Sequence, residues 1–226
     1  MPVVDCVLFD VDGTLIDTTE LIAGGLAYAV RKHLGFEPPR SELVALIGRP
    51  LVEQMRVYGP EHLVDEMSRS FIDYYEANKH MEKPYPGALE MLRAVKESGR
   101  IVGIVTSKNR HEVANFLSRI PLQAYLDVIV SSSDTKRPKP HPDPVLKALE
   151  LTNAQPSNTL FIGDSVYDMR CGKSAGVLTG AALWGPFGRD VLSAEHPDFL
   201  FESPEEVAAF LGAPMPEEKN EAAKPI

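Results

Sequence analysis

The chain has 226 residues, enough for one α/β domain and a smaller companion domain. Hydrophobic residues make up 44% of it and charged residues 24%, as in ordinary globular proteins, so it can form a sizeable core without disulfides. The formal net charge of −9 argues against a nucleic-acid partner, which would require a concentrated basic surface, and leaves room for a small phosphorylated ligand held by a few cations.

The chain contains two cysteines, Cys6 and Cys171, and neither belongs to a C-x-x-C pair. We expect both to be reduced and largely buried thiols. The N-terminal residues lack the basic and apolar regions of a signal peptide, and no run approaches the roughly 18 apolar residues of a membrane span. These features predict a cytoplasmic protein without a membrane partner, and they leave open whether it is a monomer or a homodimer.

The first predicted element is a strand over residues 3–9, a nearly continuous apolar run. Asp10 and Asp12 follow it directly, and carboxylates at i and i+2 of a strand point to the same side. Gly13, which precedes Thr14, lets the backbone turn sharply and approach a ligand closely. An Asp-x-Asp-Gly sequence by itself is more often an ordinary turn, but its place directly after a buried strand favours a ligand site.

A helical interval follows, in which residues 18–83 show no convincing strand. The patterns there predict helices over 18–34, 41–47, 51–58 and 61–79. The proline-containing stretch 83–87 is the predicted linker back to the sheet. We therefore expect an all-helical insertion after the first strand.

Beyond the insertion, short apolar runs alternate with helix-length amphipathic stretches. The predicted strands are 101–105, 128–130, 160–162 and 177–184, and the predicted helices are 88–98, 110–118, 142–151 and 165–175. This alternation predicts an open parallel sheet covered by helices.

Polar residues follow the strands of this predicted sheet. Thr106, Ser107 and Lys108 follow the strand at 101–105, and they suit either a simple helix start or a group of hydroxyls and N–H donors that hold a phosphate oxygen. Prolines on both sides of Lys139 fix the backbone around its ammonium group, although Lys136 in the same basic loop competes for the same role.

The strand at 160–162 ends in Gly163 and Asp164, and Asp168 lies one helical turn further on. Each acid could serve only to stabilise the N-terminus of the following helix. Because the carboxyl ends of parallel strands meet at one edge of a sheet, four such strand ends in one chain favour a common site.

The final predicted element is a helix near the C-terminus. Ser203 is its predicted N-cap, Pro204 suits its first position, and Glu206 would complete a capping box. The polar residues 214–226 are predicted to be a disordered tail.

Together these residues supply the groups that phosphoryl transfer requires. Mg²⁺ takes carboxylate ligands, and the transferring group needs cations and hydrogen-bond donors around its oxygens. An aspartate nucleophile divides the hydrolysis into two easier displacements.

The ordered set resembles the motifs of the haloacid dehalogenase superfamily, with D-x-D-G-T at 10–14, Thr106, K-P-x-P from Lys139 and G-D-x-x-x-D at 163–168. The resemblance covers residues 3–210. It implies an α/β fold, with a Rossmann-like open parallel sheet built from 1–16 and 84–213. It also implies an all-helical C1-type cap at 17–83, which would open and close over the active site on hinges near 15–19 and 83–87.

The resemblance also implies roles for the motif residues. Asp10 would be the nucleophile and a Mg²⁺ ligand. Asp12 would protonate the leaving oxygen, activate water and bind the metal through its carbonyl. Thr106 would donate a hydrogen bond to the phosphoryl group, Lys139 would neutralise charge around Asp10, and Asp164 would bind the metal.

Further residues are implied around this centre. Asp168 and Gly163 would orient the metal ligands, and Gly13, Thr14, Ser107 and Lys108 would bind phosphate. Arg49, in a loop at 47–51 of the predicted cap, would contact a second anionic group of the substrate, unless it is an ordinary surface arginine.

The implied substrate is a small phosphorylated metabolite. Asp12 favours a phosphate ester or anhydride, because dehalogenation needs no acid for an oxygen leaving group. Sugar phosphomutases of the superfamily usually carry a histidine about twelve residues after the nucleophile, where this chain has Ile22. A binding protein without activity would usually have lost a motif acid, and none is lost here. Asp17-Thr18, the cap loop and the segment at 184–187 resemble the phosphoglycolate phosphatase and pyrophosphatase branch, with phosphoglycolate the first choice and pyrophosphate the second.

Overall fold

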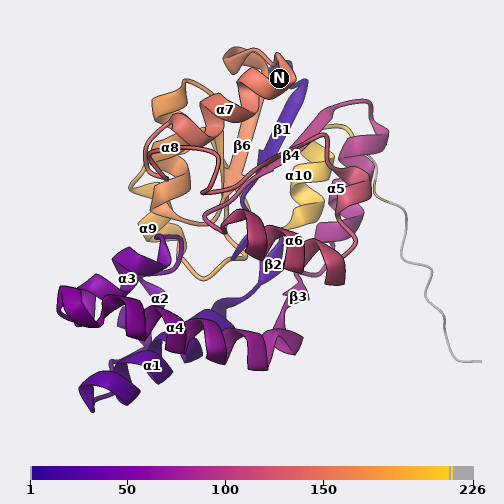
Figure 1. Ribbon diagram of the computed structural model, residues 1–226. Coiled ribbons are helices and arrows are strands. Elements are labelled where there is room, and N and C mark those ends of the chain that lie inside the picture. The colour runs from indigo at the N-terminus through magenta and orange to yellow at the C-terminus, as the bar shows by residue number, and fades with distance from the viewer. Residues whose placement is uncertain (1, 214, 216–226) are drawn as a thin grey trace, which may run out of the picture.

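The computed structural model describes residues 2–213 and 215, and its centre is a six-stranded sheet in the order β5-β4-β1-β6-β7-β8 (Figure 1). Every neighbouring pair of strands is parallel. The strands are β1 (Cys6–Phe9), β4 (Ile101–Val105), β5 (Val128–Val130), β6 (Thr159–Gly163), β7 (Leu178–Ala182) and β8 (Phe199–Phe201). The strand order departs from β1 in both directions, which creates a switch point beside β1 where open α/β folds bind ligands. The predicted Rossmann-like α/β fold is confirmed.

Successive side chains of β1 point to opposite faces of the sheet and belong to separate hydrophobic clusters. Val7 and Phe9 lie in the cluster that α5 (Ala88–Glu97), α6 (Arg110–Arg119) and α10 (Pro204–Phe210) cover. Cys6 and Leu8 lie in the cluster that α7 (Asp143–Thr152) and α8 (Val166–Ala175) cover. Because both faces are covered, the strands are apolar without alternation, which is the pattern that predicted them. The shorter helices of this part are η2 (Gln123–Tyr125), η3 (Pro156–Asn158) and α9 (Arg189–Ser193).

A group of helices inserted after β1 lies beyond the carboxyl ends of the strands (Figure 1). This helical insertion consists of α1 (Thr19–Leu34), α2 (Arg40–Val44), α3 (Leu51–Tyr58) and α4 (Glu61–Asn78), and η1 (Lys79–Met81) follows it. It has its own core, in which Leu26, Met55 and Met67 are fully buried. The helices fall within the predicted range 17–83, and the domain boundaries themselves stay a prediction.

The two crossings between the sheet and the helical insertion are paired with each other. β2 (Ile16–Asp17) and β3 (Lys83–Pro84) form a short antiparallel ribbon, with Ile16 opposite Pro84 and Asp17 opposite Lys83. The sequence gives no signal for this ribbon, because two-residue strands have no measurable periodicity. The pairing fixes both crossings side by side at the edge of the site.

Several predicted elements differ from the structure in detail. The strand β8 was not predicted, because three residues without alternation become a strand only through pairing with β7. The predicted capping box is incomplete: Ser203 Oγ accepts a bond from the N–H of Glu206 at 3.4 Å, but the Glu206 carboxylate accepts from the N–H of Glu202. The predicted tail at 214–226 lies, apart from Met215, outside the described residues. Within the described chain, no helix combines the length and apolarity that crossing a membrane requires.

Candidate active site

The predicted site residues meet at the carboxyl ends of the central strands. The N–H of Asp10 donates to the carbonyl of Ile162 and the N–H of Thr106 donates to the carbonyl of Val130, both at 2.9 Å, so the sheet ladder continues to the site residues and fixes them. The side chains of Asp10, Thr106, Lys139, Asp164 and Asp168 are all buried. Four segments far apart in the sequence thus form one buried cluster of polar side chains.

Lys139 lies between two carboxylates. Its Nζ is 2.9 Å from Oδ1 of Asp10 and 2.6 Å from Oδ1 of Asp168. Burial lowers the pKa of Lys139, but the charges of Asp10 and Asp168 outweigh burial and hold the pKa above its ordinary value. Lys136, the competing lysine, is exposed at the surface. The structure therefore brings Lys139, and not Lys136, to the predicted nucleophile.

Asp168 is fully engaged by hydrogen bonds. Its second oxygen accepts bonds from the N–H and the hydroxyl of Ser165, the N-cap of α8. Gly163 ends β6 directly against the Asp168 side chain. Asp168 thus holds the Lys139 ammonium in place, and its role in orienting the metal ligands stays a prediction.

Asp10 and Asp164 provide the acceptors that a cation would need. Oxygens of Asp10, Asp164 and Asp168 lie within 4.8 Å of one another. Thr14 Oγ1 donates to Oδ1 of Asp164 at 2.7 Å, while Oδ2 of Asp164 is buried and accepts no hydrogen bond from the described residues. A buried carboxylate oxygen without a donor is costly, and Mg²⁺ prefers such hard oxygen ligands. The residues present thus fit a Mg²⁺ ion.

The raised pKa values of Asp10 and Asp164 also fit a bound cation. Burial raises the pKa of Asp10 to about 7, an effect that Lys139 opposes and Asp168 increases. Burial, followed by the charges of Asp168 and Asp10, raises the pKa of Asp164 well above its ordinary value. One lysine cannot neutralise three buried carboxylates, so a bound divalent cation would favour the ionised form of Asp10 and Asp164.

Asp12 faces away from this cluster, toward the helical insertion. Its Oδ1 accepts a bond from Thr18 Oγ1 at 2.9 Å and lies 2.8 Å from Nζ of Lys108. Burial lowers the pKa of Lys108, but Asp12 and Tyr75 outweigh burial and keep the pKa above its ordinary value. Asp10 and Asp12 therefore contact different lysines, Lys139 and Lys108.

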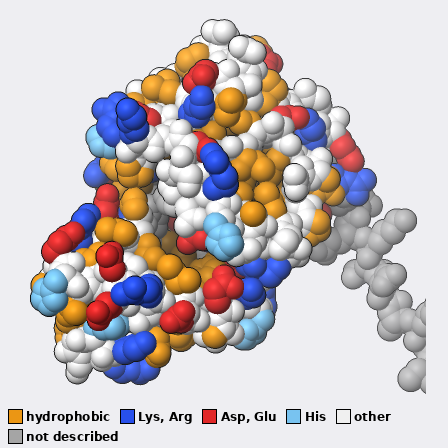
Figure 2. Space-filling model, in the orientation of Figure 1, with side chains coloured by type: hydrophobic (Ala, Val, Ile, Leu, Met, Phe, Trp, Pro, Cys, Tyr) orange, Lys and Arg blue, Asp and Glu red, His pale blue; other side chains and the backbone are white. Residues whose placement is uncertain are grey.

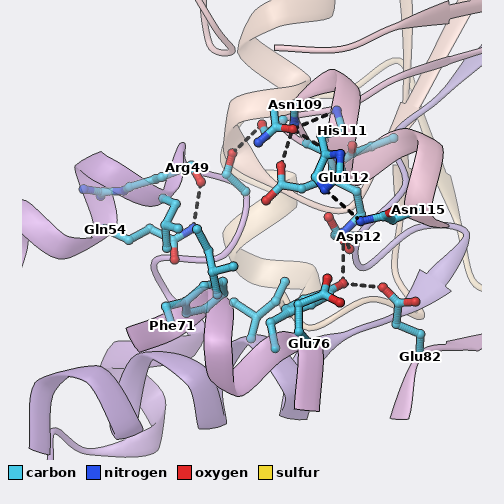
Figure 3. A pocket seen from close by; sticks show the side chains of 18 of the residues that line it. Asp12, Arg49, Gln54, Phe71, Glu76, Glu82, Asn109, His111, Glu112 and Asn115 are labelled. Carbon is cyan, nitrogen blue, oxygen red and sulfur yellow. Dashed lines mark hydrogen bonds and ion pairs between the residues drawn. The ribbon is translucent and has the colours of Figure 1, made fainter. Parts of the chain in front are cut away.

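A cavity of about 420 Å³ opens between the sheet edge and the helical insertion, and Asp10 and Asp12 lie in its wall. Figure 2 shows the hollow on this face of the molecule, and Figure 3 shows the side chains around it. The helical insertion contributes Arg49, Gln54 and Phe71 to the lining. A substrate in this cavity would be enclosed by both parts of the chain.

The loop that carries Arg49 is held against the sheet side of the cavity. Ser107 Oγ donates to the carbonyl of Gly48 at 3.0 Å, and Gln54 Nε2 donates to the carbonyl of Arg49 at 2.7 Å. Nε of Arg49 donates to the hydroxyl of Tyr167. Cζ of the same guanidinium lies 5.5 Å from the centre of the Tyr167 ring. Arg49 makes no ion pair with a carboxylate in the described part of the chain, so its charge is available to an anionic ligand.

The residues predicted to bind phosphate make different contacts in the structure. Thr14 supports Asp164, Ser107 joins the sheet side to the helical insertion, and Thr106 Oγ1 accepts a bond from the N–H of Lys108 at 3.2 Å. Sequence reasoning did not assign Tyr75, Tyr167 or Glu82 to the site. Tyr75 follows Phe71 by one helical turn, and this spacing would have indicated a core position rather than a cavity wall.

Comparisons with known proteins agree with this geometry. Residues 7–182 match the model of the haloacid dehalogenase-like hydrolase family. A candidate pyrophosphatase PpaX of Caldanaerobacter subterraneus is 37% identical over 200 residues, covering 88% of this chain and 90% of the relative. Pyrophosphatase PpaX of Anoxybacillus flavithermus is 33% identical over 210 residues, with 92% and 97% covered. The crystal structure of a candidate phosphoglycolate phosphatase from Lactobacillus plantarum has a TM-score of 0.82 and 27% identity, covering 92% of this chain and 99% of the other.

Proposed function

The chain belongs to the haloacid dehalogenase-like hydrolase family, and from this premise we propose that it hydrolyses a small phosphate anhydride or ester through an aspartyl-phosphate on Asp10. One observation carries the proposal. Asp10 and Asp12 at the sheet edge contact different lysines, and Asp164 has a buried oxygen to which no described residue donates a hydrogen bond. Asp10 and Asp12, the proposed nucleophile and acid–base group, thereby line one cavity, and an oxygen of Asp164 lies within 4.8 Å of one of Asp10.

The first displacement uses the groups around Asp10. Its carboxylate attacks phosphorus, while Lys139 and the hydroxyl of Thr106 stabilise negative charge on the phosphoryl oxygens. Mg²⁺ held by Asp10, Asp164 and the carbonyl of Asp12 would supply further neutralisation of these oxygens. Asp168 keeps Lys139 in place through the 2.6 Å ion pair. Asp12 gives a proton to the leaving oxygen, and in the second displacement it takes one from the water that cleaves the aspartyl-phosphate.

Inorganic pyrophosphate is the substrate that the relatives favour. The similar proteins at 33% and 37% identity are named pyrophosphatases, one of them as a candidate. Lys108 and Arg49 both line the cavity, and Lys108 lies beside Asp12, where a second phosphate would be bound. This reverses the order expected from the sequence, in which phosphoglycolate came first. Phosphoglycolate stays the second candidate, because the structure at 27% identity is a candidate phosphoglycolate phosphatase.

A phosphomutase activity has less support. Ile22 lines the cavity at the place where a mutase would need a histidine, and an alkyl side chain transfers no proton. A cytoplasmic location fits the proposed activity, and two free, buried cysteines are typical of a reducing compartment.

Phosphate release from a panel of pyrophosphate, phosphoglycolate, sugar phosphates and nucleotides tests the proposal. We expect Mg²⁺-dependent release that EDTA abolishes and that Asp10→Asn lowers on the order of 10³-fold or more, because the amide has the same shape but is not a nucleophile. Asp5→Asn, at the exposed residue directly before β1, is the matched control and should keep full activity. Undiminished release by Asp10→Asn would rule out the nucleophile assignment, and the ranking of the panel decides between the two substrates.

A further inference from the structure

A chain of polar contacts leads from Asp12 across the cavity wall. Lys108, which lies 2.8 Å from Asp12, donates from Nζ to the Tyr75 hydroxyl at 3.1 Å and lies 5.2 Å from the centre of the Tyr75 ring. The Tyr75 hydroxyl donates to Oε1 of Glu82, and Nε of Arg119 donates to Oε2 of Glu82 at 3.1 Å. Figure 3 shows the dashed contacts that run between Asp12 and Glu82. We call Lys108, Tyr75, Glu82 and Arg119 the tyrosine bridge.

The direction of each hydrogen bond in the tyrosine bridge is fixed by chemistry. An ammonium group can only donate and a carboxylate can only accept. The phenol of Tyr75 must therefore give its proton to Glu82 and offer its oxygen to Lys108. Glu82 is 2% exposed and the Lys108 side chain 9% exposed, so these charged contacts are little weakened by solvent.

The tyrosine bridge joins the two parts of the molecule. On the sheet side, Lys108 lies just before helix α6 and Arg119 is its last residue, whereas Tyr75 belongs to α4 of the helical insertion and Glu82 directly precedes β3. The bridge crosses between the two parts twice, at Lys108–Tyr75 and at Glu82–Arg119. It therefore forms only when the helical insertion lies over the sheet edge.

We propose that Tyr75 and Glu82 are positioning residues, which hold the Lys108 ammonium on the leaving-group side of Asp12 when the helical insertion is closed. This inference rests on the proposed function. Lys139 contacts Asp10 and serves the phosphoryl group, whereas Lys108 contacts Asp12 and serves the oxygen that leaves. Closure would then assemble the leaving-group half of the site through the hydroxyl of one tyrosine.

This role predicts a dependence on the leaving group. A phosphate or alkoxide leaving group gathers negative charge that a nearby cation stabilises, whereas p-nitrophenolate is stable without such help. Loss of the Tyr75 hydroxyl should therefore slow cleavage of pyrophosphate, or of phosphoglycolate if the panel ranks it higher, and leave p-nitrophenyl phosphate unaffected. A merely structural role would slow both substrates alike.

The test compares Tyr75→Phe with Tyr74→Phe on both substrates in the presence of Mg²⁺. Tyr74 is the neighbouring tyrosine of α4, stacks on Tyr28 and does not line the cavity, so it is the matched control. For Tyr75→Phe, we expect kcat/KM with the natural substrate to fall about tenfold, the effect of one charge-assisted hydrogen bond, and kcat/KM with p-nitrophenyl phosphate to change less than about twofold. Tyr74→Phe should match the wild type on both.

A second variant tests whether Glu82 acts through the same contact. Glu82→Gln should give a smaller loss with the same selectivity, and combining it with Tyr75→Phe should lower activity no further than Tyr75→Phe alone. Equal losses on both substrates, or no loss in Tyr75→Phe, would overturn the positioning role while leaving the proposed function intact. A wild type that releases phosphate from none of these compounds would overturn the proposed function and this inference together.

Discussion

Asp10, the proposed nucleophile, shares its lysine with a second carboxylate, whereas Asp12, the proposed acid–base residue, contacts a different lysine. Lys139 is held between Asp10 and Asp168, and Lys108 lies on Asp12. This separation keeps two adjacent aspartates in different environments, which is how two carboxyl groups take different roles in one reaction. Asp164 is left with a buried oxygen that no described residue satisfies.

The unsatisfied oxygen predicts that Mg²⁺ stabilises the fold. Saturating Mg²⁺, at about a hundredfold excess over its dissociation constant, should stabilise the protein by about 2.7 kcal/mol and raise Tm by about 5–10 °C. Asp164→Asn should abolish most of this shift, whereas Asp143→Asn, which removes a surface partner of Arg137, should retain it. Thermal unfolding with and without Mg²⁺ measures the effect. A full shift in Asp164→Asn would exclude Asp164 as a metal ligand.

The two thiols should be unreactive in the folded protein. Burial raises the pKa of Cys6 to about 11 and that of Cys171 to about 12, so at pH 8 both groups are almost entirely protonated. Because the thiolate is the reactive form, a disulfide reagent such as DTNB should label neither cysteine in the native state and both in denaturant. Rapid labelling of the native protein would contradict the burial of these residues.

Among the elements, the turn after β1 shapes the part of the site around Asp164. Gly13 has φ +84°, and a Cβ there would lie 2.3 Å from Oδ2 of Asp164. The indole N–H of Trp184 donates to the carbonyl of Thr14 at 2.8 Å and supports the same turn. The turn therefore needs both a left-handed backbone and the absence of a side chain.

Gly13 and Gly99 have nearly the same backbone conformation, so comparing them distinguishes the need for a left-handed backbone from the need for a missing side chain. Gly99 has φ +85°, but a Cβ there would have nothing within 4 Å. Gly99→Ala should cost only the strain of a left-handed residue, about 1 kcal/mol, with activity unchanged. Gly13→Ala should cost more, and it should also remove activity and the Mg²⁺-induced rise in Tm, because Asp164 must move. Denaturant unfolding and phosphate release measure the two effects, and equal behaviour of both variants would show that contact with Asp164 is unimportant.

For the molecule as a whole, the site exists only where the sheet and the helical insertion meet. The insertion has a core of its own, and it is tied to the sheet through the ribbon of β2 and β3. Its contacts with the sheet side include Gly48 with Ser107, Arg49 with Tyr167 and Tyr75 with Lys108. These few polar contacts close a cavity that substrate must enter and product must leave.

We therefore expect the helical insertion to move as a unit about the ribbon. Small-angle X-ray scattering should show a smaller radius of gyration with Mg²⁺ and orthovanadate, a phosphate mimic, than without them, because a bound anion adds contacts to Arg49 and Lys108. Arg49→Ala should weaken this contraction. Identical scattering with and without Mg²⁺ and orthovanadate would argue that the helical insertion does not move.

Five of the six strands of the central sheet, the helical insertion and the order of the polar strand ends could be predicted from the amino-acid sequence alone. Buried parallel strands must be apolar on both faces, and the acids after β1 and β6 stand out because such strands cannot carry them internally. The motif residues could therefore be found without coordinates, and the resemblance they carry was confirmed by the family match.

The contacts between segments that are distant in the chain became apparent only in the folded structure. It placed Lys139 rather than Lys136 on Asp10, directed Asp168 to Lys139, and brought Tyr75 and Glu82 to the cavity. It also formed the two short ribbon strands and β8 through pairing alone. Periodicity and motif spacing report on local structure, whereas these choices depend on how the helical insertion lies across the sheet edge, which is set by long-range packing and charge.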